Sequence, residues 1–385
     1  MKDKEFGYAM KALRMVIRRE WHRMTSRRLY LGVCVVLPLL CLFFMATIFG
    51  NGQMENIPVG IVDLDNTATS RNISRRISAA PTFRVTEHFT DEADARRALQ
   101  QKDIYGYLVI PPRFEQKAVT GTGATLTYYY HYALLSVGSE LMAAFENTLA
   151  PVALSPIVMQ AEALGVSGEQ IQTFLLPVEA STHPLYNPDM DYSIYLSQPF
   201  FFVLFQILIL LTTVYSIGSE LKFGSAGEWL EMARGNILTA VAGKLLPYTL
   251  IFSSIGILAN YVLFGPLHIP FAGSLWLMNA VTVLFIIATQ ALAVFIYSVF
   301  PKIAYIISVV SMVGSLGATL SGVTFPVTAM YAPVHAASYL FPVRHFTEAA
   351  QAMIYFDAGF AYFWQSVATC LLYTSDAADD LIGVD

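Results

Sequence analysis

Two long runs without a charged side chain, joined by a charged island, constrain this chain more than any other feature. No Asp, Glu, Lys or Arg occurs in residues 192–219 or in residues 245–301. A helix needs roughly 20 predominantly apolar residues to cross a hydrocarbon core about 30 Å thick. Each run is long enough to span a membrane. The island between them, residues 218–244, is therefore expected to lie in water on one side.

The composition agrees with a membrane protein that carries one sizeable water-exposed insert. Charged residues make up 13% of the chain, whereas soluble proteins usually hold about 25%. The three cysteines lie in apolar runs, so no disulfide framework is expected. The seven histidines are scattered without the spacing of metal ligands. We expect no metal, no cofactor and no nucleic-acid partner, and we expect membrane lipid around the apolar runs.

Residues 1–28 are basic, with nine Lys or Arg against three acids. On a helix, the apolar residues recur at spacings of three and four and form one stripe: Phe6, Met10, Leu13, Ile17, Trp21 and Met24. Basic residues, including Arg14 and Arg18, lie on other faces. This pattern is typical of a helix in the interface of an anionic leaflet, with Trp21 on its apolar side. The alternative is a positive flank that only orients the next span.

Residues 29–49 form the first predicted span, and the basic flank before it places the N-terminus in the cytoplasm. Residues 50–195 then lie on the outer side of the membrane, which is the periplasm for a protein of the bacterial inner membrane, the location that the resemblance described below implies. Strand and helix patterns alternate in this part of the chain, which predicts an α/β domain. The expected strands are residues 57–64, 83–89, 105–110 and 125–132. The expected helices are residues 70–79, residues 91–100 with Thr90 as the N-cap, and residues 134–164.

Residues 196–373 are predicted to form the membrane domain, which brings the number of spans to about six. The expected limits are 196–217, 245–264, 275–299, 303–323 and a sixth span from residue 358. Residues 324–355 are apolar but broken by three prolines, which favours a segment that enters the membrane and returns. An acidic tail, residues 374–385, cuts the sixth span short, and we interpret it as non-native sequence. The predicted fold class is an α-helical polytopic membrane protein with an inserted periplasmic α/β domain.

Within the island, residues 228–233 are predicted to form a short helix. Glu228 and Glu231 would lie near its positive end and Arg234 just past its negative end, as the helix dipole favours. Trp229 and Leu230 add an aromatic and an aliphatic side chain that an exposed loop does not require. Two interpretations stay open: a solvated loop, or a docking element for a soluble partner.

One short motif suggests catalysis. A predicted strand ends in a pair of carboxylates, Asp63 and Asp65, followed by Thr67, which resembles the nucleophile motif of haloacid-dehalogenase-type phosphatases. The later Lys and paired acids of such enzymes are not evident, so we expect a turn whose side chains cap the following helix. The chain also lacks a phosphate-binding Gly-Lys-Ser/Thr loop, because Leu245 follows Lys244. ATP binding by this chain is therefore not expected.

Polar residues inside the predicted spans are few. Four of them are candidates to line a translocation path: Gln206, Asn260, Asn279 and Gln290. Residues of this kind more often bridge helices by hydrogen bonds, and the sequence leaves both interpretations open.

Taken in order, several stretches of the chain resemble the permease subunit of type 2 ATP-binding-cassette (ABC) exporters with a large extracytoplasmic domain. The resemblance extends to about Leu372. The stretches that carry it are Val59–Asp65 with Ser70-Arg71, Gly106–Glu115, Glu220–Leu230 continuing to Gly243–Tyr248, and the Phe-Pro pairs at Phe325-Pro326 and Phe341-Pro342.

This resemblance implies a subunit that forms a translocation path and couples to a separate ATPase. The implied coupling element lies after the second span, within the loop at 218–244, and comprises Glu220, Gly224, Glu228, Trp229, Leu230, Glu231 and Arg234. Further implied partners are a second permease copy or paralogue and a periplasmic adaptor. Relatives are linked to drug or lipid-like cargo, and the few charges in the spans favour a hydrophobic or amphipathic one. The chain departs from the pattern where the acidic-basic run before Gly224 is reduced to Glu220–Phe223.

A second class of protein shares this arrangement of one span, a large outer domain and five spans. It comprises non-transporting membrane assembly or secretion scaffolds, including proteins that serve as phage receptors. An ATPase gene beside this one would favour the export interpretation.

Overall fold

The computed structural model describes residues 2–48, 54–120, 122–163, 186–187 and 193–356, together with residues 52, 191, 364 and 368; for residues 2–6 and 153–163 it describes the backbone alone. The chain divides into two compact units. The sheet unit comprises Gln53–Leu185, and the helical unit comprises Met1–Gly52 with Tyr186–Asp385. The acidic tail, and the expected sixth span apart from residues 364 and 368, lie outside the described residues.

A four-stranded sheet in the order β2-β1-β3-β4 forms the centre of the sheet unit. The strands are β1 (Ile57–Asp63), β2 (Phe83–Phe89), β3 (Gly106–Ile110) and β4 (Thr127–Tyr130). Strand β1 pairs in parallel with both β2 and β3, whereas β4 is antiparallel to β3. Parallel pairs need crossover connections, and helices supply both of them.

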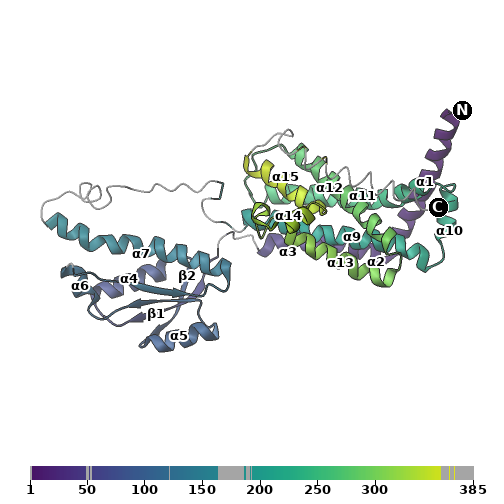
Figure 1. Ribbon diagram of the computed structural model, residues 1–385. Helices are drawn as coiled ribbons and strands as arrows, with labels where there is room; N and C mark the ends of the chain where they lie inside the picture. The colour runs from purple at the N-terminus through teal and green to yellow at the C-terminus, as the bar shows by residue number, and fades with distance from the viewer. Residues whose placement is uncertain are drawn as a thin grey trace. The chain divides into compact units, whose positions relative to one another are not determined.

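Helices cover both faces of this sheet (Figure 1). Helices α4 (Ala68–Ala79), α6 (Phe114–Thr120) and α7 (Leu135–Ala163) pack on one face, and α5 (Glu92–Gln101) packs on the other. Strands β1 and β3 are buried along almost their whole length, since both of their faces are covered. The sequence predicts the four strands and these helices, except that α6 is not predicted. Asp91 rather than Thr90 caps α5.

The turn after β1 is built by its two carboxylates. Asp63 accepts hydrogen bonds from the backbone N–H groups of Asp65 and Asn66, both at 3.0 Å, and from the Ser70 hydroxyl at 2.6 Å. Asp65 accepts from the N–H groups of Phe114 and Glu115 at 2.8 and 3.0 Å, which caps the N-terminus of α6. These bonds occupy the carboxylates in holding the turn and α6. Of the two side chains expected to cap the following helix, Thr67 caps α4, whereas Asp65 caps α6 instead.

The helical unit begins with α1 (Lys2–Ser26), α2 (Arg28–Leu31), the π-helix η1 (Gly32–Val36) and α3 (Leu37–Ile48). It continues with the π-helix η2 (Ser193–Ser197), α9 (Gln198–Lys222), α10 (Ala226–Met232), α11 (Ile237–Phe264), α12 (Leu275–Val299) and α13 (Ile303–Leu320). The 3₁₀-helix η3 (Val327–Ala329), α14 (Ala332–Ser338) and α15 (Pro342–Phe356) follow.

Five helical segments within the described residues are long and apolar enough to cross a membrane: Arg28–Ile48, Ser193–Lys222, Ile237–Phe264, Leu275–Val299 and Ile303–Leu320. Helix α9 is the most buried of them, and an aromatic cluster surrounds its first half. Phe202 contacts Phe285 of α12 and Phe346 of α15 at ring-centroid distances of 6.1 and 4.4 Å. Helix α13 approaches α9 closely at Gly314, where a side chain would collide with Ile207.

The proline-broken stretch, residues 324–355, forms η3, α14 and α15, and most of α15 is buried against its neighbours. A membrane is not part of the structure, so its entry into a bilayer stays a prediction.

The cap on α6 gives the first testable expectation. Burial by itself raises the pKa of Asp65, but hydrogen bonds from the Thr67 hydroxyl and the α6 backbone outweigh it and hold this pKa below its ordinary value. Replacing Asp65→Ala should destabilise α6 by about 1 kcal/mol, since an N-cap is lost. Hydrogen–deuterium exchange over Phe114–Thr120 should then be roughly fivefold faster at neutral pH.

A depressed pKa means that the stabilisation is present above the unfolded pKa and lost as the pH falls through the folded one. The difference between wild type and variant should therefore be full above about pH 4, the ordinary pKa of an Asp side chain, and should shrink as the pH falls further, through the lowered pKa of folded Asp65. Asp103→Ala, an exposed carboxylate in the same unit, serves as the control. Equal exchange in the Asp65 and Asp103 variants would contradict the capping role.

Candidate functional site

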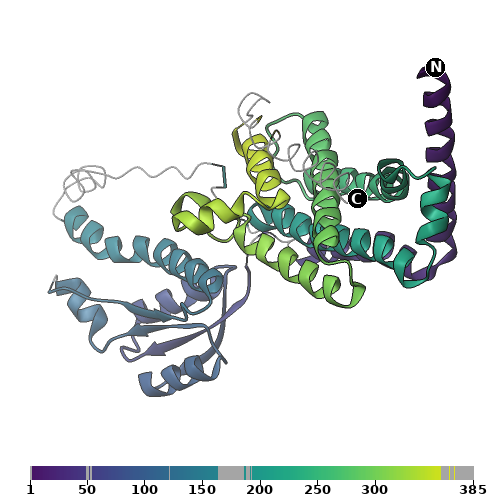
Figure 2. The same ribbon diagram turned by 45° about the vertical axis from the view of Figure 1, so that its right-hand side comes forward.

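Helix α1 packs on the rest of the helical unit through a face that its sequence pattern does not predict. The buried positions are Ala12, Val16, Glu20 and Met24. Of the described side chains of the expected apolar stripe, only Met24 is buried, Leu13 and Ile17 are half-buried, and Trp21 is 47% exposed. Contact with α11 is closest at Gly243, where a side chain would collide with Val16. Figure 2 shows α1 running crosswise to α9. The sequence pattern did not predict this buried face because the face includes Glu20, and a search for regularly spaced apolar residues passes over a glutamate.

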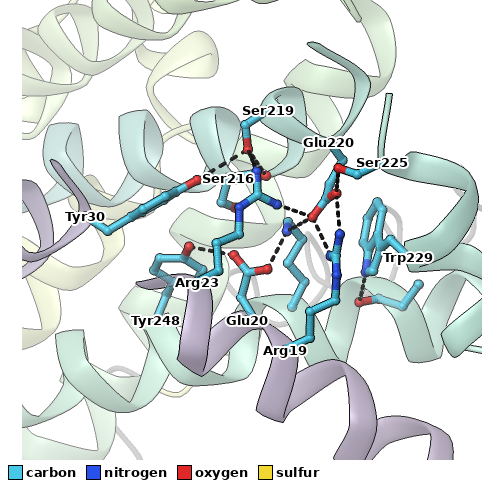
Figure 3. A network of polar contacts seen from close by, with 12 residues as sticks. Arg19, Glu20, Arg23, Tyr30, Ser216, Ser219, Glu220, Ser225, Trp229 and Tyr248 are labelled. Carbon is cyan, nitrogen blue, oxygen red and sulfur yellow. Dashed lines mark hydrogen bonds and ion pairs between the residues drawn. The ribbon is translucent and has the colours of Figure 1, made fainter. Parts of the chain in front are cut away.

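Glu220, at the C-terminal end of α9, receives charged groups from α1. Arg19 binds both of its oxygens, at 2.7 and 3.0 Å, in a bidentate pair. Arg23 forms a second ion pair with Glu220 and donates to Ser219 at 2.7 Å. The hydrogen bond to Glu220 raises the pKa of Arg19, against the opposing effect of burial. Arg19 and Arg23 therefore fasten α1 to the end of α9 (Figure 3).

Lys244, in the second turn of α11, joins the same group of charges. Its Nζ lies 2.6 Å from Oε2 of Glu20 and 2.7 Å from Oε1 of Glu220. The other oxygen of Glu20 accepts a hydrogen bond from the Tyr248 hydroxyl at 2.7 Å. We call Arg19, Glu20, Arg23, Glu220 and Lys244 the ion cluster. It joins α1, α9 and α11, and each helix supplies at least one charge.

The centre of the ion cluster is removed from water, whereas the side chains of Arg19 and Arg23 at its edge stay 21% and 11% exposed. The side chains of Glu220 and Lys244 are both 0% exposed. Isolated charges cannot be buried at acceptable cost, so the group is stable only while its members pair with one another. The three cations exceed the two carboxylates by one positive charge. The island was predicted to lie in water from residue 218 to 244, but its two ends are buried in protein, because Glu220 and Lys244 neutralise each other.

The short helix of the island, α10, is held against the same cluster. The Trp229 indole N–H donates to the carbonyl of Ala240 at 3.1 Å, and its ring lies 5.1 Å from the ammonium of Lys244. Ser225, before the first residue of α10, donates to Glu220. Trp229 thus faces the chain itself, and its role is to position α10 rather than to project into solvent.

The other residues expected in the coupling element lie on the outside of this connection. Glu228, Leu230, Glu231 and Arg234 are exposed, with Leu230 38% exposed. Gly224 has a φ of +68°, in the left-handed region that favours glycine, and ends the turn between α9 and α10. The guanidinium of Arg234 lies 4.7 Å from the ring centroid of Tyr8 of α1. Of the basic α1 residues expected at an interface, Arg14 and Arg18 are exposed.

The four polar span residues bond across helices. The amide of Asn260 in α11 donates to Asn279 and Thr282 of α12, at 2.9 and 3.0 Å. Gln290 of α12 accepts from Thr249 of α11 at 2.7 Å. Gln206 of α9 accepts from the first turn of α15, from the N–H of Val343 at 3.0 Å. These contacts match the alternative in which such residues bridge helices, and their part in a translocation path stays a prediction.

Sequence reasoning missed Glu20, Arg19, Arg23, Lys244 and Tyr248 as site residues. Two signals were present: Glu20 is the one acid between residues 6 and 28, and Lys244 is the last charge before a run of 57 uncharged residues. A charged residue directly next to a long apolar segment in the sequence is expected to be at least partly buried, so it needs a partner of opposite charge. Within the described residues, no group of three or more His, Cys, Asp or Glu side chains has the geometry of a metal site.

These features define a multi-pass helical membrane protein whose N-terminal and island helices are tied to its membrane-spanning helices by buried charges. A family model described as "ABC-2 family transporter protein" matches residues 28–374. The chain belongs to this ABC-2 transporter family, and it is a membrane permease component rather than a catalytic one. Members of the family normally work with an ABC ATPase. No curated protein and no solved structure matches the chain.

Replacing Lys244, the central cation of the ion cluster, should destabilise the helical unit. Lys244→Met leaves Glu20 and Glu220 buried without their shared partner, and breaking a buried pair in this way costs about 3–5 kcal/mol. We expect a lower midpoint of thermal unfolding in detergent and reduced abundance. Lys222→Met is the matched control, because Lys222 carries the same charge at an exposed position of α9. Equal midpoints for both variants would show that the cluster does not stabilise the fold.

Proposed function

We propose that this chain is the permease subunit of an ATP-driven ABC exporter and that α1 and α10 together form its coupling surface for a separate ATPase subunit. The observation that carries the proposal is the ion cluster. Through it, the two helices that lie outside the candidate spans are fastened to two helices that lie within them, α9 and α11. A force applied to either α1 or α10 would therefore move α9 and α11 with it.

Rigid attachment is what coupling requires. The bidentate Arg19–Glu220 pair fixes the orientation of α1 as well as its distance from α9, because two parallel hydrogen bonds define a plane. Trp229 and Ser225 tie α10 to the same carboxylate and ammonium. Movement of an ATPase on binding nucleotide would reach the spans without being absorbed by a flexible loop.

The exposed side of α10 offers the chemistry of a partner site. Leu230 supplies an apolar contact, and Glu228 and Glu231 place two carboxylates beside it. A groove with basic residues at its rim on a soluble ATPase would complement this surface. In this proposal Glu220, Gly224 and Trp229 shape the coupling element, whereas Glu228, Leu230, Glu231 and Arg234 contact the partner.

The proposal includes a membrane orientation. Residues 1–28 and 218–244 lie in the cytoplasm of a bacterial cell, and the sheet unit lies in the periplasm, where it contacts an adaptor or controls the exit. The nine basic residues before the first span support this orientation. Exposed residues of α1, including Arg14, Arg18 and Trp21, would contact the anionic leaflet. A second copy or a paralogue would complete the translocation path, and the cargo would be hydrophobic or amphipathic.

The coupling surface can be tested directly by co-purification with the cognate ATPase in detergent. Leu230→Ala and Glu231→Lys should each weaken binding by at least about tenfold, equivalent to about 1.4 kcal/mol. Transport in cells should fall in parallel. Leu250→Ala is the matched control, because Leu250 is an exposed leucine within the span of α11. If the Leu230 and Glu231 variants retain their ATPase as well as the control does, α10 is not the docking element.

The orientation can be tested with single cysteines in a background without Cys34, Cys41 and Cys370. Gly227→Cys places the thiol on exposed α10, where nothing lies within 4 Å of a side chain, and Ser78→Cys places it on the sheet unit. A membrane-impermeant thiol reagent added to intact spheroplasts should label the Ser78 variant and spare the Gly227 variant. The reverse pattern would invert the topology.

A further inference from the structure

A cavity of about 820 Å³ opens in the sheet unit beside the carboxyl ends of β1 and β2. Its walls come from the end of each strand and from one face of α4. Small-molecule sites typically measure about 300–1,000 Å³. Ligands of open α/β sheets bind outside the carboxyl ends of the strands. The volume of the cavity and its place in the fold are therefore those of a binding site. This site is separate from the ion cluster and from the coupling surface, which both lie in the helical unit.

Two arginines of α4 give the cavity its charge. Arg71 and Arg75 are one helical turn apart, line the cavity and are exposed. Within the residues that the structure describes, neither forms an ion pair. Arg71 donates one N–H to the carbonyl of Asn66 at 3.0 Å, which holds its guanidinium in place and leaves its other donors unused.

The one carboxylate in the lining does not neutralise these arginines by contact. Both oxygens of Asp63 accept hydrogen bonds from its own turn and from Ser70. The cavity lining thus contains two guanidinium groups and one carboxylate, and the hydrogen-bond acceptors of that carboxylate are already used within its own turn and by Ser70. His88, near the end of β2, adds a further polar side chain to the lining.

Two serines on the same face of α4 indicate which other functional groups the ligand has. Ser74 donates its hydroxyl proton to the carbonyl of Ser70 at 3.0 Å, and Ser78 donates to the carbonyl of Ser74 at 2.9 Å. Each oxygen therefore presents only acceptor lone pairs to the cavity. A ligand that pairs with both the arginines and the serines needs an anionic group and, beside it, hydroxyl groups that donate.

We propose that this cavity binds a small hydroxylated organic anion, with its phosphate or carboxylate between the guanidinium groups of Arg71 and Arg75 and its hydroxyls on Ser74 and Ser78. Guanidinium groups bind planar or tetrahedral oxyanions through paired, charge-assisted hydrogen bonds. Leu64, 40% exposed in the cavity lining, gives the carbon skeleton an apolar contact. This assignment is independent of any coupling to an ATPase.

Ligand-observed NMR on the full chain in a neutral detergent tests the site, because saturation transfer detects weak binding to a large particle. The probes share one skeleton: glycerol 3-phosphate, glycerate and neutral glycerol. Glycerol 3-phosphate, glycerate or both should bind, and glycerol should not. Arg71→Gln and Arg75→Gln should each weaken binding by about tenfold. Arg76→Gln is the matched control, since Arg76 is an exposed arginine of the same helix that does not line the cavity.

The source of the anion is tested in the same samples. Phosphatidic acid in the micelle that competes with glycerol 3-phosphate in wild type, and loses this effect in Arg71→Gln, would identify a lipid headgroup as the ligand. Absence of competition would assign the site to a water-soluble anion. Failure of both anions to bind wild type would overturn the proposal. So would unchanged binding in the Arg71 and Arg75 variants, or an equal loss in Arg76→Gln.

Discussion

The ammonium of Lys244 lies between two carboxylates that come from different helices, and the arrangement of the helical unit depends on this contact. Glu20 and Glu220 approach it to 2.6 and 2.7 Å inside the protein. Burying any of these charges without a partner would be costly, so Glu20 and Lys244 depend on their contact, and Glu220 depends on Lys244 together with Arg19 and Arg23. The three helices that carry these groups therefore pack together as a unit. A single one of them would not be stable with its charged side chain buried and its partners absent.

This mutual dependence sets the position of α1. Apolar pattern alone does not define the rotation of α1, since Met10 and Trp21 of its apolar stripe are exposed whereas Ala12 and Val16 are buried. The pairing of Arg19, Glu20 and Arg23 selects one rotation. It turns a small-residue face toward Gly243, where close contact is possible, and leaves Trp21 exposed. We infer that here the buried charges contribute more to a unique arrangement than to net stability.

Much of the fold was predictable, because it follows from local patterns. Charge-free runs locate the spans, alternation and turn residues locate β1 to β4, and the Trp-Leu-Glu sequence locates α10. The ion cluster was not predictable in this way, since its contacts join residues about 200 positions apart. The inward orientation of Trp229 was missed for the same reason, because its partners, Ala240 and Lys244, lie on a separate helix. Helix α6 was missed because its cap, Asp65, lies 49 residues before it.

The separation between Glu20 and Lys244 also has a consequence for synthesis. Lys244 follows Glu20 by 224 residues. At about 5–20 residues per second, a ribosome needs roughly 10–45 s to add them. For most of this interval the charged side chains of α1 have neither Glu220 nor Lys244 as a partner, so they must remain in water or at the headgroups. Helix α1 therefore leaves the ribosome long before it can reach its final position, and the helical unit closes only after α11 has been made.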